Sequence, residues 1–238
     1  MTTVLQFFPA ALDVNGDAQN ALVLAQRASW AGLDTHVLPI AIGDPVPAER
    51  PAAIVVGSSV DSELPALREA FAPFEGALRD WLADGVPLLA VGTGLELLSD
   101  GILLGEQLLE GVGIFAGRAQ PTLVERATGD LVVDTAFGRL VGFENHARGF
   151  LVPADAPALG TVVHGVGNDR RSEGARAGSA FGTHLHGPVL AKNPRFADAL
   201  LTAAFGDAYS AGDARIRFVD ETARAAQDQI LKRLEVNN

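Results

Sequence analysis

The chain has 238 residues, a formal net charge of −11 and no cysteine, and these three facts exclude several classes of protein. Hydrophobic residues make up 48% and charged residues 20%, as in a folded globular protein. The acidic balance, without any lysine or arginine cluster, argues against nucleic acid and anionic membrane surfaces as partners. The lack of cysteine excludes disulfides, thiolate metal sites and a cysteine nucleophile. The five histidines show no metal-ligand spacing with carboxylates, so neither a metal nor a cofactor is expected.

Targeting and membrane signals are equally absent from the sequence. No apolar run reaches the length of a membrane span, and the N-terminus has no basic segment followed by an apolar one. We therefore expect no membrane span, no signal peptide and a cytoplasmic location.

Strands and helices alternate in the first half of the chain. Hydrophobic patterning predicts strands at residues 4–8, 35–40, 53–57 and 86–91, with helices at 20–31 and 64–84. Gly32 and Gly85 stand where C-terminal helix caps belong. This order predicts an α/β fold with a doubly wound, mostly parallel sheet.

Short β-prone runs dominate the second half. They lie at residues 111–115, 121–125, 131–135, 139–143 and 161–166, and we interpret them as antiparallel hairpins added to the same sheet. A helix is expected to begin near Pro194 and to cover residues 196–205, and a last amphipathic helix is expected over 220–234. Because no linker or repeat interrupts the composition, residues 1–238 are expected to form a single domain.

The segment Pro87–Leu98 has the strand–turn–helix pattern on which several α/β enzymes mount a nucleophile. A buried apolar run ends in Gly92-Thr93-Gly94, and a helix-like Leu-Glu-Leu-Leu follows. The sharp corner falls on Gly92, which has no side chain. Glycine adopts strained backbone without steric cost, so the sequence predicts an elbow that lacks its attacking atom.

Three motifs in order carry a resemblance to a known family. They are Asn15-Gly16-Asp17-Ala18-Gln19-Asn20-Ala21, then Val141-Gly142-Phe143-Glu144-Asn145-His146, and then the block from Phe181-Gly182-Thr183-His184-Leu185-His186-Gly187-Pro188 to Lys192-Asn193-Pro194. The chain resembles the class I (triad) glutamine amidotransferases, which have a flavodoxin-like core. Within them it is similar to the GatD-like glutaminase subunits of lipid II isoglutaminyl synthases and, more distantly, to the CobB/CobQ-like glutaminases. The resemblance implies glutamine or a glutamine-like molecule as ligand and a MurT-like subunit of the Mur-ligase family as partner, in peptidoglycan precursor amidation.

The same resemblance implies roles for two side chains. His186 matches the general base, which takes a proton from a cysteine in active members. Arg126 matches the arginine that holds the glutamine carboxylate, a role that suits the two parallel donors of a guanidinium. Each has an ordinary alternative: His186 as a donor to a backbone carbonyl, and Arg126 as a solvated hairpin residue.

Two departures from the family pattern affect the chemistry. In the segment that matches C-x-G-x-Q, Gly92 takes the place of the cysteine and Glu96 that of the glutamine. The oxyanion loop after the third strand, glycine-rich in many relatives, is Gly57-Ser58-Ser59 here. The alternative interpretation is that these serines cap a helix that begins near Asp61.

Three functions follow from this pattern. The first is a degenerate glutaminase-like subunit that binds a ligand or a partner without hydrolysing glutamine. The second is an active amidotransferase subunit that works by another chemistry. The third is a different hydrolase or transferase on the same scaffold, using Ser58, Thr93 or Glu96 with His186.

Overall fold

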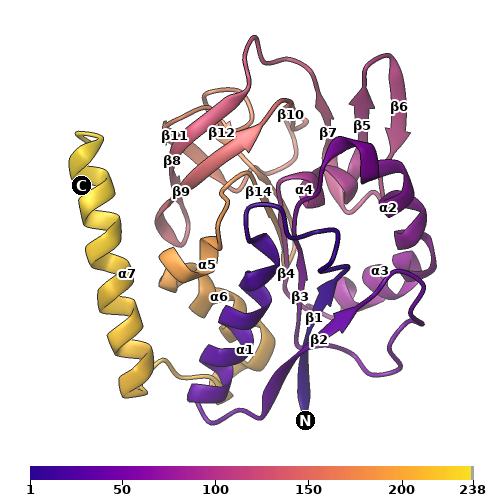
Figure 1. Ribbon diagram of the computed structural model, residues 1–238. Helices are drawn as coiled ribbons and strands as arrows, with labels where there is room; N and C mark the ends of the chain where they lie inside the picture. The colour runs from indigo at the N-terminus through magenta and orange to yellow at the C-terminus, as the bar shows by residue number, and fades with distance from the viewer. Residues whose placement is uncertain (237–238) are drawn as a thin grey trace.

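A six-stranded sheet forms the centre of the computed structural model, which describes residues 1–236 (Figure 1). Its strands, in the order β13-β14-β4-β3-β1-β2, are β1 (Thr2–Phe7), β2 (Thr35–Ile40), β3 (Ala53–Val56), β4 (Leu88–Val91), β13 (Ala175–Ala177) and β14 (Ala180–Thr183). All pairings are parallel except that of β13 with β14. The order β2-β1-β3-β4-β14 is that of flavodoxin-like folds, so the predicted class is confirmed.

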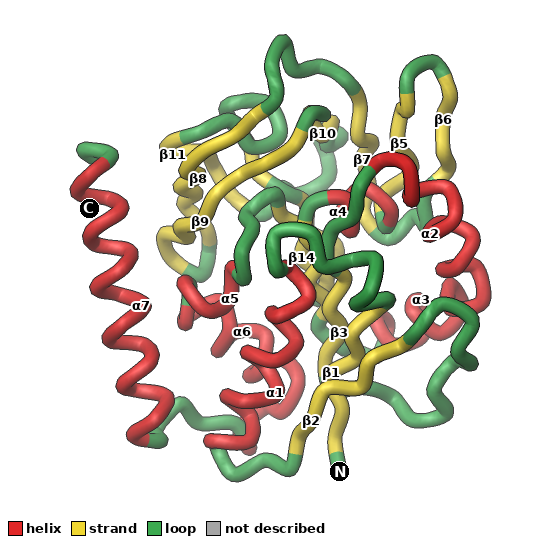
Figure 2. The backbone as a smooth tube through the Cα atoms, in the orientation of Figure 1, coloured by secondary structure: helices red, strands yellow, loops and turns green. Residues whose placement is uncertain are grey.

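Helices cover both faces of this sheet. On one side lie α1 (Asn20–Trp30), α5 (Val189–Lys192) and α6 (Pro194–Phe205), and on the other α2 (Leu64–Phe71) and α3 (Glu75–Ala83), as Figure 2 shows in red around the yellow strands. Alternate strand residues enter different cores: Val4 and Val55 pack with α1 and α6, whereas Leu5 and Ile54 pack with α2 and α3. Burial on both faces explains why these strands are continuous apolar runs.

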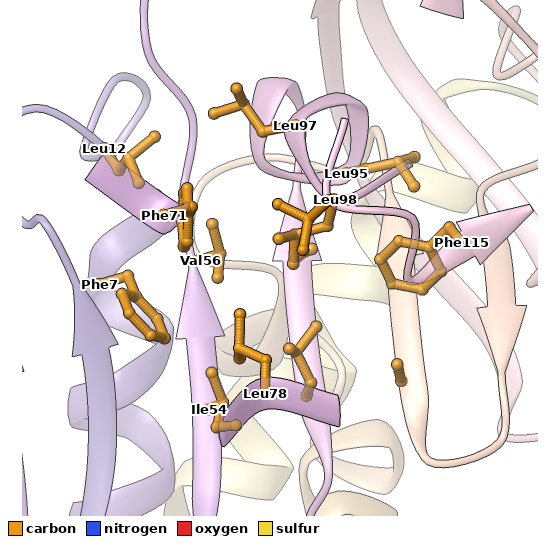
Figure 3. Packing of buried hydrophobic residues seen from close by; sticks show 14 of the residues in the cluster. Phe7, Leu12, Ile54, Val56, Phe71, Leu78, Leu95, Leu97, Leu98 and Phe115 are labelled. Carbon is orange, nitrogen blue, oxygen red and sulfur yellow. The ribbon is translucent and has the colours of Figure 1, made fainter. Parts of the chain in front are cut away.

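The hydrophobic core also fixes the turn after β4. The short helix α4 (Thr93–Leu97) follows that turn, and Leu95, Leu97 and Leu98 belong to the same buried cluster as Phe7 and Phe71 (Figure 3). Each of these leucines is fully buried. The elbow is therefore attached to a close-packed core, which leaves its backbone little freedom to relax.

Two helices differ from their predicted extents. The run over 64–84 is two helices, because Pro73 stands in a 3-10 turn between them and has no N–H for a continuous helix. The last helix, α7 (Ala214–Arg233), begins before the predicted 220 because the Asp213 side chain accepts the Arg215 N–H at 2.8 Å and caps it. The helix at α6 is confirmed.

Most antiparallel strands form two sheets of their own, so the prediction that they extend the central sheet is wrong. One sheet, β10-β7-β5-β6, contains β5 (Ser99–Leu104), β6 (Gln107–Glu110), β7 (Phe115–Gln120) and β10 (Gly149–Leu151). The other, β12-β11-β8-β9, contains β8 (Ala127–Thr135), β9 (Gly138–His146), β11 (Gly160–His164) and β12 (Ser172–Glu173). Residues 121–125 are a loop, and only Phe115 of 111–115 is in a strand. The β8–β9 hairpin contacts the segment that follows β14 through an isolated antiparallel bridge between Phe143 and His186.

Within residues 1–236, no helix is both long enough and apolar enough to cross a membrane.

Candidate functional site

The candidate site lies where parallel strands of the central sheet end. Asp17, Ser58, Gly92 and His186 follow β1, β3, β4 and β14, and the carboxyl edge of an open α/β sheet is where such folds bind ligands. A cavity of about 190 Å³ opens there, and Ser58, Gly92, His186 and Arg126 all line it. The structure thus places these four residues around one cavity, together with Ser59, Thr93 and Glu96. Gly57 is outside the lining, and a β-carbon on it would collide with the Leu12 carbonyl.

Gly92 has the backbone of a nucleophile elbow. Its φ of 56° and ψ of −122° lie in a region that L residues rarely adopt, between the end of β4 and the start of α4. The Gly92 N–H donates to the Thr183 carbonyl at 2.8 Å, which fixes the turn to β14. The predicted turn is therefore present in this chain without a side chain on it.

His186 is held by a buried carboxylate. Its Nδ1 lies 2.7 Å from Asp17 Oδ2, and because a carboxylate only accepts, Nδ1 donates. Asp17 is fully buried and also accepts the Ser58 hydroxyl at 2.5 Å and the Gly187 N–H at 3.2 Å. The alternative in which His186 donates to a backbone carbonyl does not hold. The pair of His186 and Asp17 has the geometry of an oriented general base.

The ring of His186 fills the space beside Gly92. A β-carbon at position 92 would lie 2.6 Å from His186 Cε1 and 2.9 Å from the Ser58 β-carbon, closer than β-carbons approach other atoms in folded proteins. The second ring nitrogen, Nε2, is buried without a hydrogen-bond partner and lies 3.4 Å from the same point. The base therefore packs against the elbow at the place where a nucleophilic side chain would begin.

The loop after β3 is bonded to the elbow helix. The Ser59 N–H donates to Thr93 Oγ1 at 2.7 Å, and the Ser59 hydroxyl donates to Glu63 at 2.7 Å. Neither serine caps the turn that begins at Asp61, so the capping interpretation is wrong. Thr93 Oγ1 is engaged with the Ser59 backbone, which argues against Thr93 as a nucleophile.

A buried ion pair forms another wall of the cavity. Arg148 Nη2 lies 2.7 Å from Glu96 Oε2, and Arg148 also donates to both Asp61 oxygens at 2.8 Å. Glu96 is 2% exposed. A carboxylate bonded in this way is the counter-ion of Arg148, which argues against Glu96 as a general base.

Sequence reasoning missed two of these residues as parts of the site. Asp17 stands in the Asn15-Gly16-Asp17 segment that carries the family resemblance, but nothing in the sequence links it to His186. Arg148 follows the G-F-E-N-H motif by two positions, and its contacts with Glu96 and Asp61 depend on the path of the loop after β9. Proximity to a recognised motif was the only available signal in both cases.

Two histidines, His146 in the cavity wall and the fully buried His184, lie with their rings in contact at an angle of 35°. His146 Nδ1 lies 2.7 Å from the Arg148 carbonyl and Nε2 lies 3.0 Å from Glu144 Oε2, so both nitrogens donate and the ring is charged. Burial opposes this charge, but the hydrogen bonds to Glu144 and to the Arg148 carbonyl outweigh burial and raise the pKa of His146. The ring of His184 packs against it with centroids 4.2 Å apart, and His184 Nδ1 is hydrogen-bonded to Glu173. Burial, together with the charge of His146, lowers the pKa of His184.

The charged His146 makes stability depend on pH. A histidine whose pKa is raised by folding stabilises the protein fully below its unfolded pKa of about 6.5, and this contribution is lost as pH rises through the folded value. The difference in unfolding free energy between the wild type and His146→Gln, measured by urea titration, should therefore shrink as the pH is raised from 6 to 9. The lowered pKa of His184 acts in the opposite sense, because its contribution is lost as pH falls. A difference that stays constant with pH would contradict a charged His146.

Comparisons with known proteins bear on the same residues. Residues 14–194 match the family model of the CobB/CobQ-like glutamine amidotransferase domain. The chain belongs to the CobB/CobQ-like glutamine amidotransferase family. The chain is also similar to the GatD subunit of lipid II isoglutaminyl synthase (glutamine-hydrolyzing) from Staphylococcus aureus, at 30% identity over 85% of this chain and 84% of that protein. The subunit of the same name from Streptococcus pneumoniae is 25% identical over 83% of this chain and 78% of that protein.

Solved structures support the fold of this amidotransferase domain. A crystal structure of a glutamine amidotransferase superposes with a TM-score of 0.58 at 14% identity, covering 84% of this chain and 98% of the other. A glutamine amidotransferase from Thermotoga maritima gives a TM-score of 0.54 at 17% identity, covering 99% and 95%. The segment that matches the amidotransferase family contains Asp17, Gly92, Arg126, Arg148 and His186, whereas α7 lies outside it.

Proposed function

We propose that this chain is a GatD-like subunit of a lipid II isoglutaminyl synthase that binds a ligand and a partner but does not hydrolyse glutamine. Its partner in this proposal is a MurT-like subunit of the Mur-ligase family, and its ligand is glutamine or a glutamine-like molecule. The partnership and a cytoplasmic location rest on the similarity to the two GatD subunits and on the family resemblance. We also treat residues 1–238 as one domain.

The position of the His186 ring carries the proposal. In a thiol-dependent glutaminase a side chain at the elbow must lie between its base and the substrate. Here the ring stands within 2.6 Å of where the β-carbon at position 92 would be. His186 is retained and is oriented by Asp17. Its second ring nitrogen, Nε2, is buried without a hydrogen-bond partner next to Gly92, which has no side chain. This arrangement supports a site in which the His186 ring occupies the space that a nucleophilic side chain at position 92 would need.

No other side chain at the site is favoured as a replacement nucleophile. The single proton of the Ser58 hydroxyl is directed to Asp17 Oδ2 at 2.5 Å, with the Val14 carbonyl as a second acceptor at 2.9 Å, and not to His186. Thr93 Oγ1 is bonded to Ser59, and Glu96 to Arg148. No specific observation favours a different hydrolase or transferase.

Ammonia release from L-glutamine tests the proposal. We expect the purified chain, alone or with a co-expressed Mur-ligase-like partner, to release no ammonia above the enzyme-free rate, because no thioester can form. Stable co-elution with that partner in size-exclusion chromatography is expected at the same time. The glutamine-hydrolyzing relative from Staphylococcus aureus serves as the positive control.

A variant separates true turnover from contamination. Ammonia release that disappears in His186→Ala would overturn the loss of hydrolysis, whereas release that persists in His186→Ala indicates a contaminating glutaminase. Failure to bind any Mur-ligase-like partner would overturn the proposed partnership.

A further inference from the structure

Two arginines line the cavity, and their charges are compensated very differently. Arg148 is 7% exposed and bonds two carboxylates, Glu96 and Asp61. Arg126 is exposed, and within residues 1–236 its guanidinium donates to neutral groups, Asn145 Oδ1 at 2.8 Å and the Asn145 carbonyl at 3.2 Å. Among the residues that the structure describes, no carboxylate lies within ion-pair distance of Arg126. One cation in the cavity is neutralised and the other is not.

The cluster around Arg148 has a negative charge in excess. Two carboxylates share one guanidinium, and the buried one, Glu96, is closed off from solvent. The excess therefore faces the cavity at Asp61, whose side chain is 61% exposed while both its oxygens are fixed at 2.8 Å by Arg148. Hydrogen bonds from Arg148 lower the pKa of Asp61, so this group is a carboxylate at neutral pH. A carboxylate oxygen has two lone pairs, so each can accept another donor.

The free positive and negative charges lie close enough to act on one ligand. Both Arg126 and Asp61 line the cavity of about 190 Å³, and the charge of Arg126 contributes to lowering the pKa of Asp61. A ligand that meets both groups must carry an anionic and a cationic end a short distance apart. The carboxylate and ammonium groups of a free α-amino acid have this arrangement.

We propose that Asp61, fixed by Arg148, binds the α-ammonium group of a free amino acid whose carboxylate pairs with Arg126. Arg148 acts as a positioning residue for Asp61, because its donors already face two carboxylates. The proposal deepens the proposed function and rests on it in one respect, that the cavity still binds a ligand. It implies that the site selects zwitterions and rejects amino acids whose nitrogen is acylated or peptide-linked.

A ligand series on the unaltered protein tests this without any substitution. Isothermal titration calorimetry is carried out with L-glutamine, with 4-carbamoylbutanoate, which lacks only the α-ammonium group, and with N-acetyl-L-glutamine. We expect L-glutamine to bind about tenfold or more tightly than the other two, as for one hydrogen bond to a charged group. Equal affinity for L-glutamine and 4-carbamoylbutanoate would overturn the proposal.

Substitution then assigns the effect to Asp61. In Asp61→Asn, affinity for L-glutamine should fall about tenfold while affinity for 4-carbamoylbutanoate is unchanged. Asp84→Asn is the matched control, since the Asp84 side chain is 63% exposed and pairs with Arg50 outside the cavity. An equal loss for both ligands in Asp61→Asn would assign Asp61 a merely structural role and overturn the proposal.

The outcomes also separate this inference from the proposed function. Ammonia release during the titration would overturn the non-hydrolysing role, yet KM values for L-glutamine and 4-carbamoylbutanoate would still test the ammonium contact. If none of the three ligands binds at about 10 mM, the ammonium site is overturned, while a structural role in a partner complex stands.

Discussion

Replacing Gly92 with alanine is expected to destabilise the protein by about 3 kcal/mol, more than its backbone conformation alone explains. A residue with a β-carbon at φ 56° and ψ −122° is strained by about 1–3 kcal/mol. The new β-carbon would also meet His186 Cε1 at 2.6 Å and the Ser58 β-carbon at 2.9 Å, and overpacking of this kind adds about 1–3 kcal/mol. Urea denaturation gives the change in unfolding free energy.

Gly206 provides a matched control for the backbone term. Its φ of 55° and ψ of −137° are close to those of Gly92, but a β-carbon there would meet no atom within 4 Å. Gly206→Ala should therefore cost only the strain, about 1–2 kcal/mol. If Gly92→Ala lowers the unfolding free energy no more than Gly206→Ala does, His186 and Ser58 do not exclude a side chain at position 92.

Ser58 makes this expectation sharper, because the two departures from the family pattern meet in space. Ser58→Gly removes one of the two groups that a β-carbon at position 92 would contact. A double-mutant cycle of Gly92→Ala with Ser58→Gly should show a favourable coupling of about 1 kcal/mol. The loss of Asp17 as hydrogen-bond partner in Ser58→Gly cancels in the cycle. Coupling of this sign would mean that the two departures depend on each other: Ser58 in the oxyanion loop is tolerated because position 92 is glycine.

The sequence predicted the parts of this site that lie in local patterns. An apolar run followed by Gly92-Thr93-Gly94 specifies a strand and a tight turn, because only glycine adopts that backbone freely. The alternation of strands and helices likewise specified the parallel sheet, which the structure confirms. These features depend on residues a few positions apart, so the printed order of residues is sufficient to find them.

Contacts between distant segments were not predictable in this way. Asp17 and His186 are 169 positions apart and meet because β1 and β14 end at the same edge of the sheet. The separate sheets of the second half were not predicted for the same reason. A β-prone run predicts a strand, but the strand with which it pairs depends on register and on the path of loops such as 121–125. Arg148 belongs to this class as well, since its two carboxylate partners come from different elements.

Removal of Arg148 is the second substitution for which a large effect is expected. Arg148→Met leaves the carboxylate of Glu96, 2% exposed, without its counter-ion and leaves Asp61 unfixed. Breaking a buried ion pair by removing one partner costs about 3–5 kcal/mol, mainly because an uncompensated charge stays buried. We expect a loss of about 4 kcal/mol in unfolding free energy by urea denaturation, with methionine chosen to keep most of the side-chain volume.

Removing the second charge distinguishes this cause from a loss of packing. In the double variant Arg148→Met with Glu96→Gln, neither buried charge of this ion pair remains, so most of the lost stability should return. Arg50→Met provides the surface comparison, because Arg50 and Asp84 are both more than half exposed and 3.6 Å apart, and its cost should stay below about 1 kcal/mol. If the double variant is as unstable as Arg148→Met, Arg148 stabilises the protein through packing and not by compensating the charge of Glu96. Recovery would instead mean that glutamate at position 96 is the partner which allows a buried arginine to hold Asp61 at the cavity.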